Sequence, residues 1–458
     1  MEAELVIAGG TLVTTDGVRR GAIAIAEGRF VAVGPDESMP AARERVDATG
    51  RMVLPGVIDT HVHARDPSVD AREDFTSATA AAAVGGITTI LEMPISTPSV
   101  HDRKTFEARA AIADAKVHVD VGLYGGAAGD NLATIEEQAA AGAVAFKTFR
   151  TAAPPGRERE FVGLCAPDPA DYRAALERIA RTGRMSAVHA EDAGMLARGA
   201  ATLQAAGDRG PLSHARWRPE LVELTSVAEC LDLARQTGAR LQLAHCSTPR
   251  AVELATRARS DGAEVTVETC PHYLSLTEAD LERFGPFAKI NPALRSEEAV
   301  EGLWAQLRAG EIDVVGSDHS PFLVEEKAPF ADDLWGALPG APGLEALLPM
   351  LLTAVAEGRL DWSRLVAVTS ANAAHLYGLA SKGALRVGTD ADIVLVDPDR
   401  RWTIDTTRWL TRSRGTAAIW DGRAVTGAPV ATYVRGHLVA NDGVLVGERG
   451  WGRVVRPA

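Results

Sequence analysis

Histidines stand at the ends of apolar, strand-like runs of this chain, where they could bind metal ions. The first such run ends in the segment Asp59-Thr-His-Val-His63. Because side chains two residues apart on a strand point to the same side, the imidazoles of His61 and His63 can reach one ion. A His-x-His pair alone is weak evidence, since a single histidine at a strand end is more often a satisfied polar group. The pair gains weight only if other strand ends carry ligands.

Three later strand-like runs also end in potential metal ligands. His189 ends one run, His245 ends the next, and Asp318 ends the last in the segment Gly316-Ser-Asp-His-Ser-Pro321. Imidazole and carboxylate groups together suit zinc or a similar divalent ion. Because several strand ends carry such groups, we predict a shared metal site in preference to separate polar groups with unrelated roles.

Lys147 is the one cation in the apolar segment Ala143-Val-Ala-Phe-Lys-Thr-Phe149. A buried ammonium without a partner is costly and tends to lose its proton. The neutral amine is a nucleophile toward carbonyl compounds, including CO₂, and the resulting carbamate could bridge two cations. Alternatively, the tip of the side chain reaches solvent or pairs with a nearby aspartate. The residues by themselves favour neither interpretation.

The elements that position these residues alternate between strand and helix. Eight strands separated by helices predict an α/β fold, a (β/α)₈ TIM barrel, in which the C-terminal strand ends build the active site. A doubly wound open sheet is the competing fold, but no Gly-x-Gly-x-x-Gly follows the first strand. The strand-like runs begin near Met52, Thr88, Val119, Ala143, Met185, Arg240, Glu264 and Asp313. Helix-like stretches include Phe75–Val84, Arg103–Ala115, Asp171–Arg181, Ser226–Gln236 and Arg250–Arg259.

Both ends of the chain consist of short strands with glycine-containing turns. Examples are Ala22-Ile-Ala-Ile-Ala26 near the start and His437-Leu-Val-Ala-Asn-Asp-Gly443 near the end. Such patterns are typical of antiparallel sheets. We therefore expect residues 1–54 and 376–458 to form one small β-sandwich domain, with a metal-dependent barrel hydrolase domain at 55–375.

Composition and charge restrict the partners of this 458-residue chain. It carries 61 acidic and 48 basic residues, a net charge of −13, which argues against a broad nucleic-acid or anionic-membrane surface. No apolar run approaches the roughly 18–20 residues of a membrane span. The 4 cysteines are scattered, and the N-terminal residues lack the order of a signal peptide, so we expect a cytoplasmic protein with a small-molecule substrate.

The motifs, taken in this order, resemble the amidohydrolase superfamily in its cyclic-amide branch of allantoinases, hydantoinases or dihydropyrimidinases, and dihydroorotases. The resemblance covers nearly the whole chain and is much more specific for the branch than for the substrate. It is carried by Asp-x-His-x-His at 59–63, Phe146-Lys-Thr-Phe149, His189, His245, Glu268-Thr-Cys-Pro-His-Tyr-Leu274, Lys289-Ile-Asn-Pro-Ala-Leu-Arg295, Ser317-Asp-His-Ser-Pro321 and Gly340-Ala-Pro-Gly-Leu-Glu345.

This resemblance implies a binuclear centre of two divalent ions, expected to be Zn²⁺. Lys147, as N6-carboxylysine, would bridge the two ions together with a hydroxide. Asp318 would take the hydroxide proton and later deliver it to the leaving ring nitrogen. Because such enzymes are usually tetramers or dimers, a homo-oligomer is expected. The more buried ion would be held by His61, His63 and Asp318, and the second ion by His189 and His245.

Three residues are the expected substrate contacts. Arg65 matches the dihydroorotase pattern His-x-His-x-Arg, in which the arginine meets a substrate carboxylate; alternatively, it pairs with Asp66 or Asp70 at the rim. Asn291 in Asn-Pro-Ala-Leu-Arg also leans toward dihydroorotase. Gly343, in the segment that begins at Gly340, is the third expected contact.

Two apolar residues bear on which ring is opened. Ile95 and Phe322 stand where dihydroorotases carry asparagine and histidine, which could contact a carboxylate. Their apolar side chains favour a hydantoin-type ring over dihydroorotate, with allantoin, converted to allantoate, as the first named substrate. Dihydroorotase and hydantoinase or dihydropyrimidinase activities remain alternatives. A non-catalytic, dihydroorotase-like scaffold is disfavoured, because the chain keeps all the metal ligands that the resemblance implies.

Overall fold

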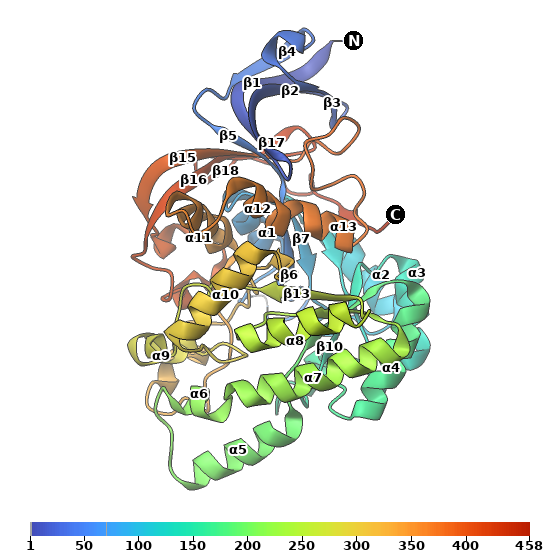
Figure 1. Ribbon diagram of the computed structural model, residues 1–458, viewed down its shortest axis with the longest axis vertical. Helices are drawn as coiled ribbons and strands as arrows, with labels where there is room; N and C mark the ends of the chain where they lie inside the picture. Colours follow the sequence, from blue (N-terminus) through green and yellow to red (C-terminus); the bar gives the residue numbers. More distant parts are fainter. Residues whose placement is uncertain (1, 70) are drawn as a thin grey trace.

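The computed structural model describes residues 2–69 and 71–458. Parallel strands form a barrel, and a second sheet made from both chain ends covers one end of it (Figure 1). The barrel strands are β6 (Val57–Val62), β7 (Ile87–Glu92), β8 continued by β9 (Asp120–Leu123 and Gly125–Gly126), β10 (Ala145–Phe149), β11 (Met185–His189), β12 (Arg240–Leu243), β13 (Val265–Thr269) and β14 (Val314–Val315).

Parallel pairing closes these strands into a ring. One sheet contains β6, β7 and β8, and the other runs in order from β14 to β9. Only Tyr124 separates β8 from β9, and a parallel bridge between Val62 and His319 joins β6 to the segment after β14. The expected (β/α)₈ barrel is confirmed.

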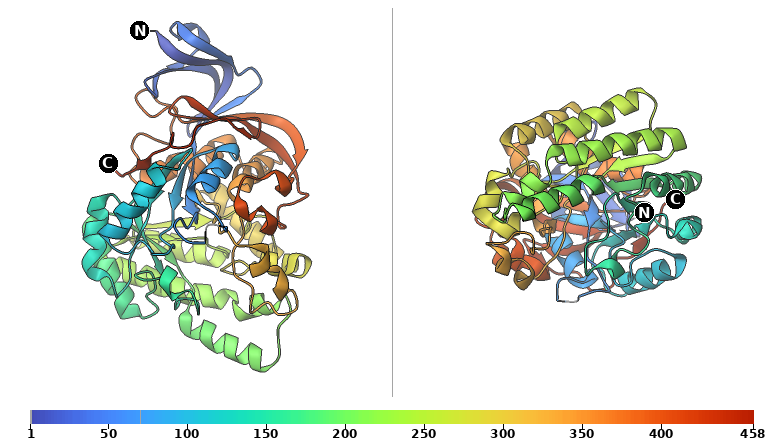
Figure 2. Two further views of the ribbon diagram at one scale, coloured as in Figure 1. Left: turned by 180° about the vertical axis from the view of Figure 1, so that it is seen from behind. Right: turned by 90° about the horizontal axis from the view of Figure 1, so that it is seen from below.

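Helices surround the barrel, as the view from below in Figure 2 shows. Local capping starts them: the Asp74 carboxylate accepts a hydrogen bond from Ser77 N at 2.8 Å, and Asp102 accepts one from Thr105 N at 2.7 Å. Such caps satisfy N–H groups that the first turn of a helix leaves without partners. The main helices are α1 (Phe75–Val84), α2 (Arg103–Asp114), α3 (Ile135–Ala141), α4 (Pro169–Thr182), α7 (Glu220–Thr237), α8 (Pro249–Ser260), α10 (Glu297–Ala309) and α11 (Leu344–Ala356).

A layer of apolar side chains inside the barrel determines where the polar groups lie. Ala145 and Ala187 belong to one buried cluster with Ile58 and other residues from the barrel strands. Lys147 and His189 follow these two alanines by two positions, so they face the same interior, one layer nearer the C-terminal strand ends. The barrel interior is therefore apolar below and polar at the mouth.

The two chain ends form one nine-stranded sheet, shown above the barrel in Figure 1. β5 links the ends, because Thr11 of β1 pairs with Met52 in parallel and Ile393 of β15 pairs with Pro55 in the antiparallel direction. The sheet folds around a core that contains side chains from both ends, which confirms the expected β-sandwich. Its strands are β1 (Ala3–Thr14), β2 (Gly17–Ala26), β3 (Arg29–Gly34), β4 (Ala42–Asp47), β5 (Met52–Pro55), β15 (Ile393–Thr403), β16 (Ala424–Val434), β17 (His437–Asn441) and β18 (Val444–Leu445).

The run expected to start the barrel near Met52 is in fact two strands. β5 belongs to the terminal sheet, and the barrel begins at Val57 in β6. Gly56 lies between them, where an added β-carbon would come within 2.7 Å of the Asp392 β-carbon. The expected barrel strand was wrong for residues 52–55, although the expected domain boundary had assigned residues 1–54 to the β-sandwich. These residues pair with β1 and β15, a partnership that their apolar character alone does not reveal.

Two parts of the C-terminal range leave the terminal sheet. β19 (Val454–Val455) pairs in parallel with β8 of the barrel. The segment between β15 and β16, with its short helices η8 (Thr406–Arg408) and η9 (Arg412–Thr416), packs against barrel loops. Trp420 within it donates a hydrogen bond to Pro342 O at 2.7 Å. Residues 376–458 are therefore not all part of the β-sandwich, and one segment reaches the barrel mouth.

A buried ionic cluster joins the barrel to the terminal sheet. The Lys382 ammonium lies 2.8 Å from Asp120 Oδ2 of β8 and 2.6 Å from Asp392 Oδ2. Asp390 completes a group of three carboxylates that could geometrically hold a cation, but the ammonium already occupies that role. Among the described residues, no helix is long and apolar enough to cross a membrane.

Candidate metal centre

The first group of ligands lies at the C-terminal end of β6. His61 Nε2 and His63 Nε2 are 3.4 and 3.5 Å from the same oxygen, Oδ1 of Asp318, which follows β14. Asp59 joins the two strands, because its Oδ1 accepts hydrogen bonds from His61 N and Ser317 N. Asp318 has a φ of 47°, a left-handed conformation that is uncommon outside glycine and often marks functional sites. Two imidazoles converging on one carboxylate oxygen suit a divalent ion.

The second group of ligands lies at the ends of β11 and β12, two strands that pair with each other. His189 Nδ1, at the end of β11, is 3.1 Å from His245 Nε2, just after β12. Two lone pairs at this distance repel each other, so a proton or a cation must lie between them. Glu191 Oε2 is 2.8 Å from His189 Nε2, and a carboxylate only accepts, so Nε2 carries the proton and Nδ1 offers its lone pair. The pair can therefore bind a cation together.

These imidazoles are held in their neutral form. Burial lowers the pKa of His63 and of His245 well below the ordinary 6.5, and the charges of neighbouring histidines and of Lys147 lower both pKa values further. Burial also lowers the pKa of His189, against the opposing effect of Glu191. Metal ions bind neutral imidazole, so His63, His189 and His245 are in the ligand form at neutral pH.

Lys147 lies among these groups on β10. Its side chain is fully buried, and its Nζ has no hydrogen-bond partner within residues 2–69 and 71–458. Burial lowers the pKa of Lys147 from 10.5 to about 8, although the charges of Glu268 and Asp318 oppose this shift. A buried amine with a lowered pKa and no partner fits the group that CO₂ would carboxylate.

Glu268 on β13 orients His61 from behind. Its Oε1 lies 2.7 Å from His61 Nδ1, and its Oε2 accepts hydrogen bonds from Thr60 Oγ1 at 2.6 Å and Gln242 Nε2 at 2.9 Å. Such carboxylates fix the ring orientation of a metal-binding histidine. We did not predict this role from the sequence, although an acidic residue within an apolar strand-like run was visible there.

Glu191 has the corresponding role for His189. It accepts a hydrogen bond from His189 Nε2 and forms a buried ion pair with Arg218. Burial alone would raise the pKa of Glu191, but the Arg218 charge and the His189 hydrogen bond lower it to about 2. This residue was also missed, and its only sequence clue is its position two residues after a predicted ligand.

Arg65 is directed toward protein groups at the rim. Its Nη2 donates to Ser320 Oγ at 2.9 Å, and its guanidinium lies 4.6 Å from the centre of the Phe322 ring. Its Nη1 is 4.0 Å from Glu160 Oε2. Asp66, one of the alternative partners, instead pairs with Lys116.

The other alternative partner of Arg65, Asp70, lies outside the described residues. Among the groups the structure does describe, Nε and Nη1 of Arg65 are buried without a hydrogen-bond partner.

The two other expected substrate contacts, Asn291 and Gly343, differ in whether their polar atoms already have hydrogen-bond partners within the protein. Asn291 Oδ1 is buried with no hydrogen-bond partner in the described part of the chain. Gly343 N donates to His319 Nδ1 at 3.2 Å, and Gly343 O accepts from Ala346 N at 3.0 Å. Any contribution of Gly343 to substrate binding thus comes from its missing side chain, since a β-carbon would lie 2.9 Å from Ser317 O.

The two apolar residues at the mouth have different surroundings. Ile95 packs in a small apolar cluster with Phe161 and Leu164, from the loop after β10. Phe322 is fully buried behind Arg65, so it acts on the mouth through the arginine that stacks on it. We expected both side chains to face a substrate directly, and the structure differs for Phe322.

A model of the amidohydrolase family matches residues 52–439, a range that contains every ligand described above. The chain belongs to the amidohydrolase family. This membership confirms the resemblance found in the sequence.

Individual relatives of this amidohydrolase match along almost their full length. An L-hydantoinase of Paenarthrobacter aurescens is 38% identical over 447 residues, covering 97% of this chain and 96% of that protein. An allantoinase of Rubrobacter xylanophilus is 38% identical over 460 residues, covering 99% and 98%. The enzyme class, a cyclic amidohydrolase, is confirmed, and a non-catalytic scaffold has no support.

Solved structures agree with the fold of the amidohydrolase. The L-hydantoinase (dihydropyrimidinase) from Arthrobacter aurescens has a TM-score of 0.95 at 38% identity, covering 99% of this chain and 100% of that chain. A D-hydantoinase structure has a TM-score of 0.91 at 30% identity, covering 99% of each chain. The family is metal-dependent and binuclear, which fits the two groups of ligand atoms described here.

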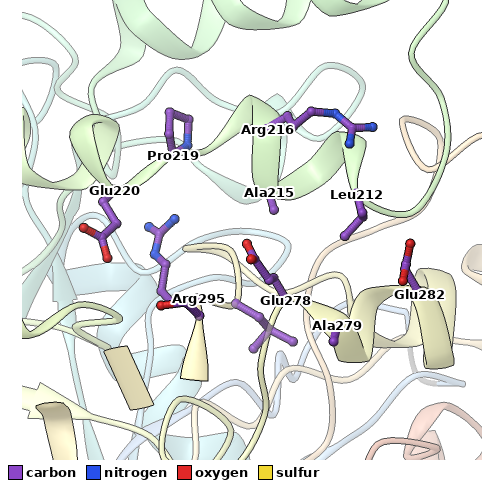
Figure 3. Close-up of a pocket in the computed structure, with 11 residues that line it drawn as sticks. Leu212, Ala215, Arg216, Pro219, Glu220, Glu278, Ala279, Glu282 and Arg295 are labelled. Atoms are coloured by element: carbon purple, nitrogen blue, oxygen red, sulfur yellow. The ribbon is translucent and has the colours of Figure 1, made fainter. Parts of the chain in front are cut away.

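A separate groove of about 520 Å³ lies between α6 (Ser213–Trp217) and α9 (Ala279–Phe284) of the amidohydrolase (Figure 3). Arg216 stands on one side of it and Glu278 and Glu282 on the other. Arg295 in its wall is bound to Glu223 at 3.0 Å. None of the residues that line this groove belongs to the candidate ligands described above.

Proposed function

We propose that this amidohydrolase opens a hydantoin-type ring, with allantoin, converted to allantoate, as its first substrate. Two of its relatives, an allantoinase and an L-hydantoinase, are both 38% identical to it. The observation that carries the choice against dihydroorotate is the position of Arg65. This cation is stacked on Phe322 and bonded to Ser320, and Glu160 lies 4.0 Å from its Nη1. A substrate carboxylate there would have to share Arg65 with an existing negative charge, whereas a neutral group would not.

The metal centre would hold two divalent ions, with Zn²⁺ as the proposed metal. The Lys147 amine would react with CO₂ to form a carbamate, releasing one proton, and the carbamate oxygens would bridge the ions. When bound, the two cations would lower the pKa of water between them and polarise the substrate carbonyl. The proposed ligands are His61, His63, Lys147, His189, His245 and Asp318.

Asp318 would move the proton in the reaction. Burial raises its pKa above the ordinary 3.8, against the opposing charges of His61 and Lys147, which favours uptake of a proton by its carboxylate. Water would add its oxygen to the ring carbonyl carbon while Asp318 takes the proton. The ring C–N bond would then break as Asp318 delivers that proton to the leaving nitrogen.

Three groups would position the ring. The buried Nε and Nη1 atoms of Arg65 and Oδ1 of Asn291 lack partners among the described residues, which supports a role in hydrogen bonding to the substrate. Gly343 would contribute by leaving space beside Ser317 O. A cyclic amide offers the carbonyl and N–H groups that these contacts require.

Glu160 supports the preference for a substrate without a carboxylate. Burial raises the pKa of Glu160, but the hydrogen bond and charge of Arg157 lower it by more. The net pKa is therefore below the ordinary 4.5. Glu160 is thus ionised, and it lies 4.0 Å from Arg65 Nη1. A substrate carboxylate at Arg65 would meet this negative charge, whereas a neutral ureido group would not.

A hydantoin with an apolar substituent is the second candidate substrate. Ile95, Phe161 and Leu164 form a small apolar cluster against which Phe149 packs. Phe149 also lies next to the metal centre, with its ring 5.4 Å from that of His189. An apolar substituent could pack against these side chains.

A substrate panel with metal-loaded protein tests the proposal. We expect kcat/KM for allantoin to exceed that for dihydroorotate by roughly a hundredfold or more. The carboxylate of dihydroorotate would lose its hydration without gaining matching polar partners in this pocket, and each missing partner costs about 1–3 kcal/mol. Unsubstituted and apolar 5-substituted hydantoins complete the panel, with ring opening followed in the ultraviolet. If dihydroorotate is the fastest substrate, the interpretation of Arg65, Ile95 and Phe322 is wrong.

A further inference from the structure

His319, the residue after Asp318, is fully buried and has both ring nitrogens bound. Gly343 N donates to Nδ1 at 3.2 Å, and Nε2 lies 3.2 Å from Glu73 Oε2. Because the donor at Nδ1 is a backbone N–H, Nδ1 must accept, so the proton is on Nε2 and points to Glu73. The ring is therefore fixed in one tautomer and one orientation.

The main chain of His319 is connected to the metal centre. Its carbonyl oxygen accepts a hydrogen bond from His63 N at 2.9 Å, and its N–H donates to Ser317 Oγ at 3.0 Å. Asp318 lies between Ser317 and His319 with a φ of 47°, a conformation that persists only when its surroundings hold it. A fixed His319 ring thus holds the peptide that carries Asp318.

Glu73 in turn is held by the C-terminal segment. The Thr411 hydroxyl donates to Glu73 Oε2, the oxygen that faces His319, and Ser77 Oγ donates to Oε1. Thr411 is 338 positions away from Glu73 in the chain. Glu73 lies just before α1, so this contact ties the segment between β15 and β16 to a barrel loop.

A second acidic side chain places Thr411 beside Glu73. Glu345, near the start of α11, accepts hydrogen bonds from Leu410 N at 2.9 Å and Thr411 N at 3.4 Å. Gly343, which binds His319, comes two residues before Glu345. Both glutamate side chains that hold the C-terminal segment, Glu73 and Glu345, thus contact or adjoin groups that hold the His319 ring.

We propose that Glu73 and Thr411 are positioning residues for Asp318, acting through His319, so that the C-terminal segment is part of the catalytic apparatus. The inference rests on the metal centre proposed above. Glu73 aligns the His319 ring, and the Thr411 hydroxyl keeps the Glu73 carboxylate in place. Asp318 remains the group that contacts the reacting atoms.

The variant Thr411→Val tests this, because it keeps the shape and removes only the hydroxyl. Outer partners of metal ligands are typically worth about 10–100-fold in metal affinity or activity. We therefore expect roughly tenfold faster loss of Zn²⁺ to a chelator and about a tenfold lower kcat for ring opening, with KM unchanged. Thr411→Ser, which restores the hydroxyl, should return both quantities to the wild-type values, and Glu73→Gln should change both in the same direction as Thr411→Val.

Thr406→Val is the matched control. Thr406 stands in the same segment and also donates its hydroxyl to a carboxylate, Asp421 Oδ1, at 3.0 Å, but no hydrogen bond among the described residues links it to His319. It should lower the melting temperature about as much as Thr411→Val does, while leaving Zn²⁺ release and kcat unchanged.

The outcomes separate this proposal from the proposed function. If Thr411→Val changes only the melting temperature, or raises KM with kcat unchanged, the positioning role is refuted. If Thr411→Val releases Zn²⁺ faster and Thr406→Val does not, while no variant opens any ring, the positioning role stands and the proposed function fails.

Discussion

Oε1 of Glu268 lies 2.7 Å from Nδ1 of His61, a residue 207 positions earlier in the chain. Burial would raise the pKa of Glu268, but the charge and hydrogen bond of His61 lower it below the ordinary 4.5. The ionised carboxylate keeps the His61 proton on Nδ1, so the Nε2 lone pair faces Asp318. One carboxylate on β13 thereby sets the tautomer of a proposed metal ligand on β6.

Glu268→Gln should weaken metal binding while the fold survives. An amide has one acceptor oxygen where the carboxylate has two, so it cannot serve His61 and the Thr60 hydroxyl equally well. The affinity for Zn²⁺ should fall about 10–100-fold, measured by competition with a chelator. Asp313→Asn is the control, because Asp313 pairs with Arg259 and accepts Val267 N at 2.7 Å, outside the metal centre. Equal affinities in the two variants would contradict the role of Glu268.

Asp318→Asn should abolish most turnover. Asparagine keeps the shape of Asp318, but it cannot accept the proton that the mechanism assigns to this residue. Proton transfer by a positioned group is typically worth about 10²–10⁴-fold, so kcat should fall by at least that range while the melting temperature stays near the wild-type value. Near-normal turnover at neutral pH would rule out the proton-transfer role.

The positions of the proposed ligands could be predicted because each one terminates a local pattern. Met185–His189 is an apolar strand that ends in a histidine, and the strand begins at the predicted residue. Lys147 was identified because a charge inside an apolar run conflicts with burial. These inferences depend only on residues that are neighbours in the sequence.

The supporting contacts could not be predicted, because they join residues far apart in the chain. Glu73 meets His319 across 246 positions, and the pairing depends on how the barrel closes. Phe322 was correctly noted as apolar, but the stacking of Arg65 on it follows from side-chain packing. The division of the run at Met52 depended on strand partners that the run itself does not identify.

Glu160→Gln should shift the substrate preference. Removing the negative charge 4.0 Å from Arg65 Nη1 would make this cation more available to a substrate carboxylate. We expect kcat/KM for dihydroorotate to rise relative to allantoin by about tenfold, which is roughly 1.4 kcal/mol. Glu158→Gln, at an exposed position of the same loop, should leave the ratio unchanged. An unchanged ratio in Glu160→Gln would show that Glu160 does not select the substrate.

Glu345 should make the stability depend on pH. Burial raises its pKa from 4.5 to about 8, so between these values the folded chain holds a proton that the unfolded chain has released. Its stabilising contribution is complete below pH 4.5 and is lost as the pH rises toward 8, with a maximum slope of about 1.4 kcal/mol per pH unit.

Glu345→Gln, which cannot ionise, should therefore flatten the unfolding free energy measured by urea titration across this pH range. Glu357→Gln, at an exposed residue just after the same helix, should not. Parallel curves for Glu345→Gln and the wild type would contradict the raised pKa.

Metal content and turnover measured together on Lys147→Ala test the central claim most directly. The wild type, loaded with Zn²⁺ in the presence of bicarbonate, should bind two ions per chain and open the allantoin ring, as should Lys104→Met, an exposed control. Lys147→Ala should lose at least one ion and most of its turnover, and a short-chain carboxylic acid should restore part of both by supplying the missing carboxylate. An alanine variant with full metal content and normal turnover would show that Lys147 does not bridge the centre.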